Sequence, residues 1–150
     1  MDINQDIVRS RLEVRRSSIL DLVDVSDEQE VVIVDNFAIG IEVMSKLLLS
    51  KGYKVTTLCN ADALMDFFNE RYYEFKLLGK LPILIVESDL VQMSGFDATK
   101  QVKESFPEIK VIMLSCDNNT QLNSSSHFVD RFLTKPVFSN EVDAAIKALL

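Results

Sequence analysis

The stretch Leu81-Pro82-Ile83-Leu84-Ile85-Val86-Glu87-Ser88-Asp89 decides the fold, because a continuous apolar run ends there at two carboxylates. A run of this length, bounded by Pro82, is typical of a strand buried on both faces of a parallel α/β sheet. Such sheets bind ligands beyond the carboxyl ends of their strands. Glu87 and Asp89 are therefore candidate site residues, although two carboxylates after a strand are equally typical of a solvated loop.

Length and composition indicate one folded domain. The chain has 150 residues, of which 47% are hydrophobic and 26% are charged. A chain of this length can bury most of its apolar surface without disulfides or structural metals. The composition is that of an ordinary globular protein and not of a disordered one.

The charge and the cysteines narrow the class of partner. A net charge of -7 would repel nucleic acids and anionic membranes, so we expect proteins or small cations as partners. Cys59 and Cys116 form no disulfide framework and are expected to be free thiols in a reducing compartment. No run approaches the roughly 18 apolar residues of a membrane span, and the first residues do not have the pattern of a signal peptide. We therefore expect a cytoplasmic protein.

Residues 1–29 are expected to form an amino-terminal helical extension, and residues 30–150 the compact domain. The extension contains no Gly or Pro, and its apolar residues recur at roughly helical spacing: Ile3, Ile7, Leu12, Ile19 and Val23. It could be a linker helix, a dimerisation element or a flap on the edge of the domain.

Within the compact domain, strand patterns alternate with helix patterns. Besides the central run, strands are expected at Val31–Val34, Tyr53–Leu58, Val111–Leu114 and Phe128–Leu133. Helices are expected over Ala38–Ser50, from an Asn60 cap to about Phe75, after the loop Met93-Ser94-Gly95 with a close at Phe106-Pro107, over the polar residues 117–126, and from a Ser139 cap to Leu150. Residues 69–80 would lead to the central strand as a long connection. This alternation predicts a doubly wound, five-stranded parallel sheet with helices on both faces.

Polar groups follow four of the five predicted strands. Asp35, Glu87, Ser115 and Lys135 come at the ends of the first, third, fourth and fifth strands. In a parallel sheet these ends share one edge, where the crevice of a doubly wound fold lies. Carboxylate oxygens suit a divalent cation, and a hydroxyl with an ammonium can hold an anion. The sequence therefore predicts a combined cation and anion site.

From about Val31 to Leu150 the chain resembles the receiver domain of two-component response regulators. The resemblance rests on four segments in order: Val32-Ile33-Val34-Asp35-Asn36, Ile83-Leu84-Ile85-Val86-Glu87 with Met93-Ser94-Gly95, Ile112-Met113-Leu114-Ser115, and Phe132-Leu133-Thr134-Lys135-Pro136. It implies a flavodoxin-like fold with strand order 2-1-3-4-5. It also implies protein partners, namely a histidine kinase, a phosphotransfer protein or an effector.

The resemblance assigns a role to each residue of the predicted site. In the family an aspartate accepts a phosphoryl group with the help of Mg²⁺, and Glu87 occupies that acceptor position. Asp35 and Asn36 occupy the positions of the acidic pair that holds Mg²⁺, and Asp89 the position whose backbone carbonyl completes the metal site. The remaining three positions are the hydroxyl that grips the phosphoryl group, the neutralising cation and the aromatic switch, occupied here by Ser115, Lys135 and Phe132.

Two departures from the family pattern point away from phosphotransfer. Glu87 replaces the expected Asp, so its carboxylate stands one methylene further into the space that the phosphoryl group needs, and in-line attack tolerates such misplacement poorly. Asn36 replaces a carboxylate, which should weaken the binding of Mg²⁺. We therefore expect no cofactor, or weakly bound Mg²⁺.

The resulting hypothesis is a degenerate receiver, or pseudo-receiver, in which Glu87 pairs with Lys135 and holds one signalling state without phosphate. Such a module would have no enzymatic activity and would act by protein contacts or self-association, through the face of the fourth and fifth helices and the last strand. Two alternatives remain. Glu87 or Asp89 could be an unusual phosphoacceptor, or the chain could be an unrelated α/β hydrolase or nucleotide-binding domain. The second is disfavoured because no Gly-rich loop or Ser-His pairing occurs.

Overall fold

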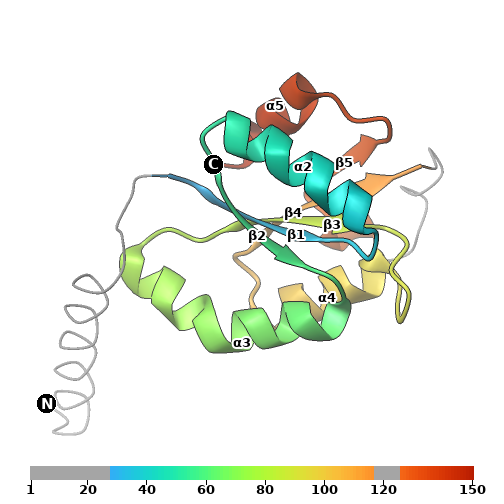
Figure 1. The fold of residues 1–150 in the computed structure, drawn as a ribbon. Coiled ribbons are helices and arrows are strands. Elements are labelled where there is room, and N and C mark those ends of the chain that lie inside the picture. Colours follow the sequence, from blue (N-terminus) through green and yellow to red (C-terminus); the bar gives the residue numbers. More distant parts are fainter. Residues whose placement is uncertain (1–27, 117–125) are drawn as a thin grey trace, which may run out of the picture.

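The computed structural model describes residues 28–116 and 126–150 (Figure 1). The predicted amino-terminal extension and the predicted helix over residues 117–126 therefore lie almost entirely outside the described residues. Within these ranges no helix is both long and apolar enough to cross a membrane.

The described strands form one parallel sheet, which confirms the predicted fold class. The strands, labelled as in Figure 1, are β1 (Glu30–Val34), β2 (Lys54–Leu58), β3 (Ile83–Glu87), β4 (Lys110–Ser115) and β5 (Arg131–Thr134). Their order is β2-β1-β3-β4-β5, and every neighbouring pair is parallel. The central position of β1 and β3 explains their continuous apolar sequences, because both faces of these strands are covered.

In residues 28–116 and 126–150, two helices cover each face of the sheet. Helices α2 (Ala38–Ser50) and α5 (Ser139–Leu149) lie on one face, and α3 (Ala61–Leu78) and α4 (Gly95–Ser105) lie on the other (Figure 1). Alternate residues of each central strand enter the two cores: Val32 and Leu84 pack toward α3 and α4, whereas Ile33 and Ile85 pack toward α2 and α5. A one-residue slip would exchange these two sets, so the register is strongly fixed.

Helix α3 is longer than the sequence pattern predicts. It continues to Leu78 because Phe75 is buried on the same face as Phe68, and it ends at Gly79, whose φ of 73° suits a left-handed C-cap. The expected long connection before β3 is thus wrong, since only residues 79–82 separate the two elements. At the other end of α3, the side chain of Asn60 accepts a hydrogen bond from Ala63 N–H at 2.7 Å, which confirms the predicted cap.

Three other predicted boundaries are also wrong: the starts of the last strand, of α5 and of β2. The last strand begins at Arg131, because Ser126–Phe128 form a 3₁₀ turn, labelled η2. Before that strand, the carboxylate of Asp130 accepts a hydrogen bond from Val111 N–H at 2.7 Å. Ser139 is the first residue of α5 and not its cap, since Phe138 occupies the N-cap position without a side-chain hydrogen bond.

Tyr53 precedes β2 instead of opening it, and its hydroxyl donates a hydrogen bond to Asp143 of α5. The position of the Tyr53 side chain therefore depends on tertiary packing against α5. The alternation of apolar and polar residues along a strand does not predict such a contact.

Candidate functional site

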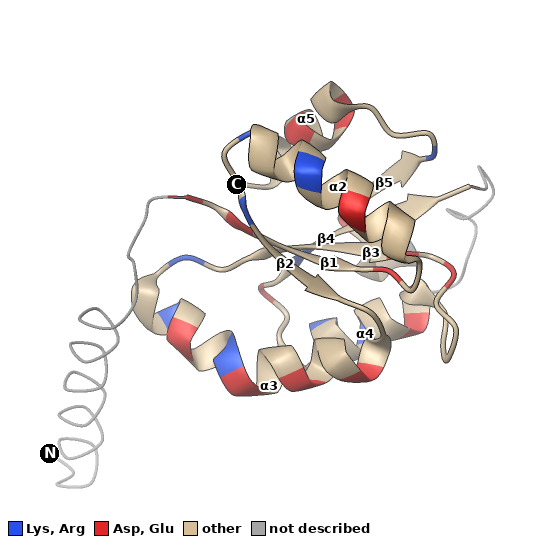
Figure 2. Cartoon of the chain, in the orientation of Figure 1, with Lys and Arg blue, Asp and Glu red and all other residues tan. Residues whose placement is uncertain are grey.

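The predicted site residues meet at the carboxyl edge of the sheet. Glu87 and Ser115 are the last residues of β3 and β4, and Asp35 and Lys135 directly follow β1 and β5. The first three are buried, each with at most 5% of its surface exposed. Figure 2 shows acidic residues in the connections after β1 and β3 and a basic residue in the connection after β5. The convergence follows directly from the strand order β1-β3-β4-β5.

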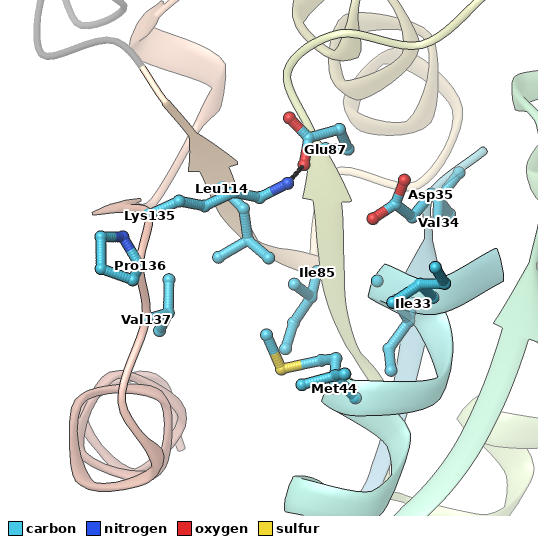
Figure 3. Close-up of a pocket in the computed structure, with 13 residues that line it drawn as sticks. Ile33, Val34, Asp35, Met44, Ile85, Glu87, Leu114, Lys135, Pro136 and Val137 are labelled. Atoms are coloured by element: carbon cyan, nitrogen blue, oxygen red, sulfur yellow. Dashed lines mark ion pairs between the residues drawn. The ribbon is translucent and has the colours of Figure 1, made fainter. Parts of the chain in front are cut away.

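Lys135 and Glu87 form an ion pair, as the sequence predicts. The Nζ atom of Lys135 contacts Oε2 of Glu87, and the two side chains are 32% and 4% exposed (Figure 3). Partial burial favours the neutral form of Lys135, but the hydrogen bond to Glu87 and the charges of Glu87 and Asp35 outweigh it and hold the pKa of Lys135 above its ordinary value. The cation is therefore firmly charged at neutral pH.

The backbone fixes the position of Lys135. Its N–H donates a hydrogen bond to the carbonyl of Ser115 at 2.8 Å, directly beyond the last β4–β5 pair, Ser115 with Thr134. The next peptide bond, between Lys135 and Pro136, is cis. The backbone of Lys135 thus lies beside the end of β4, and its side chain extends from there to Glu87 of β3.

Asp35 and Asn36 lie between β1 and α2. The Oδ1 atom of Asp35 accepts a hydrogen bond from Phe37 N–H at 3.0 Å. Its Oδ2 atom lies close to Gly40, where a β-carbon would come within 2.8 Å. The Oδ1 atom of Asn36 is buried and accepts no hydrogen bond from the described residues. Asp35 therefore has one oxygen committed to the backbone and one directed toward the first turn of α2.

In the described ranges, no three acidic, cysteine or histidine side chains converge as metal ligands at the predicted Mg²⁺ site or elsewhere. The ammonium of Lys135 contacts Glu87, so a cation bound to the Glu87 carboxylate would meet like charge. Asp89 is exposed and its backbone bridges Ser94. The expectation of weak or absent Mg²⁺ stays a prediction.

Phe132, at the proposed switch position, is half-buried. Its ring packs against the core on the side of α3 and α4, with its centroid 6.2 Å from that of Phe96. Met113 is its partner across the β4–β5 pair, two positions before Ser115. Phe132 thus lies three residues before Lys135, and its role as a switch stays a prediction.

Sequence reasoning missed a cavity beside this site. It has a volume of about 320 Å³ and opens between α2 and the connection from β5 to α5 (Figure 3). The residues around it are Ile33, Val34, Asp35, Ile39, Gly40, Val43, Met44, Ile85, Glu87, Leu114, Lys135, Pro136 and Val137. Gly40, a glycine inside a helical pattern, was the one available signal, because a glycine weakens a helix and can mark a close packing contact.

The comparisons with known proteins agree with the resemblance. Residues 31–147 match the response regulator receiver domain family. The chain is 30% identical over 119 residues to the two-component response regulator ORR3 of Oryza sativa subsp. indica. The matched region covers 77% of this chain and 86% of that protein. ORR6 of Oryza sativa subsp. japonica is 30% identical over 126 residues, covering 79% and 69% of the two chains.

Solved structures show the same fold. A response regulator receiver domain protein from Clostridium thermocellum superimposes with a TM-score of 0.71 at 19% identity, covering 81% of this chain and 93% of that one. The response regulator TrrA from Thermotoga maritima, solved in complex with Mg²⁺-BeF, gives a TM-score of 0.71 at 20% identity, covering 81% and 99%.

Proposed function

The chain belongs to the response regulator receiver domain family, and from that premise we propose that it is a degenerate receiver whose signalling state does not depend on phosphorylation. The observation that carries the proposal is the ion pair between Glu87, at the acceptor position, and Lys135. Lys135 is the cation that the family pattern assigns to the phosphoryl group. In this chain its ammonium contacts the carboxylate of Glu87.

The ion pair opposes phosphotransfer for two reasons. A carboxylate nucleophile must present an oxygen in line with the incoming phosphorus, and Oε2 of Glu87 is held by the ammonium of Lys135. The same ammonium would have to leave Glu87 to neutralise a phosphoryl group. Because Glu87 is 4% exposed, the departure of Lys135 would leave a buried carboxylate without a counter-ion.

The metal side of the site supports the same proposal. Asn36 contributes no charge, and Asp35 already accepts a hydrogen bond from the backbone. One free carboxylate beside an ammonium attracts a divalent cation weakly, since affinity for Mg²⁺ depends on the number and charge of oxygen ligands. We propose that Mg²⁺ binds weakly or not at all.

The function would then be exercised by contact with other proteins. Receivers of two-component systems work with protein partners, and we propose a kinase, a phosphotransfer protein, an effector or a second copy of the chain, with no enzymatic activity of its own. Of the expected docking face, the structure describes β5 and α5, whereas the helix predicted over residues 117–126 lies almost entirely outside the described residues. The negative net charge favours a partner with a basic surface over nucleic acid or an anionic membrane. The cytoplasmic location stays a prediction.

Intact mass spectrometry after incubation with acetyl phosphate and Mg²⁺ tests the proposal. We expect no gain of a phosphoryl group, and none when Glu87→Ala is treated in the same way. A stable gain that disappears in Glu87→Ala would establish the alternative, an acidic phosphoacceptor at Glu87. A gain that disappears in Asp89→Asn would assign the acceptor role to the exposed Asp89.

A further inference from the structure

The cavity beside the ion pair is built like a binding site for a small molecule. Its volume of about 320 Å³ is at the lower end of the range of small-molecule pockets, roughly 300 to 1,000 Å³. Most of its wall is apolar, formed by α2, the ends of the central strands and the connection from β5 to α5 (Figure 3). A predominantly apolar wall with a few convergent polar groups is the usual composition of ligand pockets.

The cavity lies between α2 and the β5–α5 connection, and part of its rim is exposed to solvent. Ile39 and Val43 border the cavity, yet they are 78% and 61% exposed. Phe37 and Phe138, which are close in sequence to the lining residues Ile39 and Val137, are also exposed. Exposed apolar side chains around a cavity are unfavourable in water unless something covers them, and together they form a patch of the kind that marks a binding site.

The polar groups at the cavity carry one net negative charge at neutral pH. Glu87 and Lys135 neutralise each other, which leaves the carboxylate of Asp35. Gly40 leaves room for Oδ2 of Asp35 beside α2, since a β-carbon at position 40 would come within 2.8 Å of that oxygen. A glycine inside a helix costs roughly 1 kcal/mol relative to alanine, so this room is obtained at the expense of helix stability.

We propose that this cavity binds a small amphiphilic molecule with an apolar body and one cationic head. The body would lie against Met44, Leu114 and Val137, and the head would reach Oδ2 of Asp35. Charge complementarity decides the class: a monovalent cation balances the net charge of Asp35, Glu87 and Lys135, whereas an anion at Oδ2 would meet the carboxylate of Asp35. The inference goes beyond the proposed function and does not depend on it, because binding requires neither phosphorylation nor its absence.

Methionine methyl signals give a direct test, with 2-phenylethylammonium, 2-phenylethanol and phenylacetate as probes in Mg²⁺-free buffer. Met44 borders the cavity, and Met113 lies in the core on the opposite face of the sheet. In ¹³C-methyl spectra of the full chain, we expect the ammonium probe to shift Met44 in a saturable way and to leave Met113 unchanged. We expect its affinity to exceed that of phenylacetate at least about tenfold, a conservative figure for one unit-charge contact near a protein surface.

Three variants define the site. Asp35→Asn should reduce the affinity for the ammonium probe about tenfold, to that of the alcohol. Val43→Trp should fill the cavity and abolish the Met44 shift, whereas Leu49→Trp, equally exposed on α2 but not part of the cavity wall, should leave it intact. The proposal is overturned if all three probes bind equally, if both Trp variants behave alike, or if Met44 shifts with protein concentration alone, which would identify a second copy as the occupant.

Discussion

The carboxylate of Glu87 contacts the ammonium of Lys135, although the strands that carry them, β3 and β5, are not neighbours in the sheet. Strand β4 lies between them, so the Lys135 side chain crosses the end of β4 to reach Glu87. The pair is also unequal, because Glu87 is almost wholly buried and Lys135 is about one-third exposed. The loss of one partner and the loss of both should therefore have different consequences.

Removing the cation alone should destabilise the domain. In Lys135→Met the Glu87 carboxylate stays buried without its counter-ion, which should lower the free energy of unfolding at pH 7 by about 1 to 3 kcal/mol, less than for a fully buried pair. The double variant with Glu87→Met should recover most of this loss, because both charges are gone. Urea unfolding measures both values. Lys46→Met is the control, since Lys46 pairs with Glu42 on the exposed face of α2 and should change stability by less than about 0.5 kcal/mol. Equal effects of Lys135→Met and Lys46→Met would contradict the role given to the buried pair.

Tyr53 should make stability fall at alkaline pH. Burial, the 2.5 Å hydrogen bond to Asp143 and the charge of Asp143 raise the pKa of Tyr53 to about 12. In the unfolded chain Tyr53 ionises near pH 10, so its contribution is complete below pH 10 and is lost as the pH rises toward 12.

Tyr53→Phe isolates this contribution. At pH 8 it should be about 1 kcal/mol less stable than the wild type, the usual value of a hydrogen bond, and the gap should shrink as the pH rises above 10. Urea unfolding at several pH values gives the difference, and other alkaline transitions cancel in it. Tyr73→Phe, at an exposed position of α3, should show no such trend. A constant gap between pH 8 and 11 would refute the assignment.

The sheet and its functional edge were predictable because they follow from local signals. The apolar run Ile83–Val86 predicts a strand buried on both faces. The parallel topology then brings Asp35, Glu87 and Lys135 to one edge of the sheet, independently of the loop conformations. The pairing of Glu87 with Lys135 was predictable too, because a lengthened carboxylate opposite a lysine has few other partners in a crowded site.

The remaining features depend on tertiary contacts that no local pattern encodes. Helix α3 extends because Phe75 occupies a buried position, and the cavity is lined by residues of α2, of the central strands and of the β5–α5 connection. Both depend on how elements distant in sequence pack. Gly40 was visible from the start, but the carboxylate oxygen beside it could be identified only in three dimensions.

Gly95 should tolerate no side chain, in contrast to Gly40. A β-carbon on Gly95 would lie 2.2 Å from the backbone carbonyl oxygen of Glu87 and 2.9 Å from Cα of Ser88. Backbone atoms in a central strand cannot yield cheaply, so Gly95→Ala should lower the free energy of unfolding by about 2 to 3 kcal/mol. In Gly40→Ala the contact is with the end of the Asp35 side chain, and alanine favours the helix, so the change should stay within about 1 kcal/mol. Thermal and urea unfolding compare the two. Similar losses would show that the loop after β3 is less closely packed against α4 than the structure indicates.

Restoring the two acidic residues of the family pattern should restore phosphoryl acceptance. Glu87→Asp shortens the side chain by one methylene, which withdraws the carboxylate from the space for the phosphoryl group and breaks its contact with Lys135. Asn36→Asp adds the missing charge for Mg²⁺. The double variant should therefore gain one phosphoryl group from acetyl phosphate, only with Mg²⁺ present, while the wild type gains none.

Intact mass after a rapid acid quench measures the gain, and Lys135→Met in the same background should suppress it, because the cation is then needed for the phosphoryl oxygens. If the double variant binds Mg²⁺ and still accepts no phosphoryl group, the acceptor position is not what disables the site, and the Glu87–Lys135 pair would be a consequence of lost phosphotransfer instead of its cause.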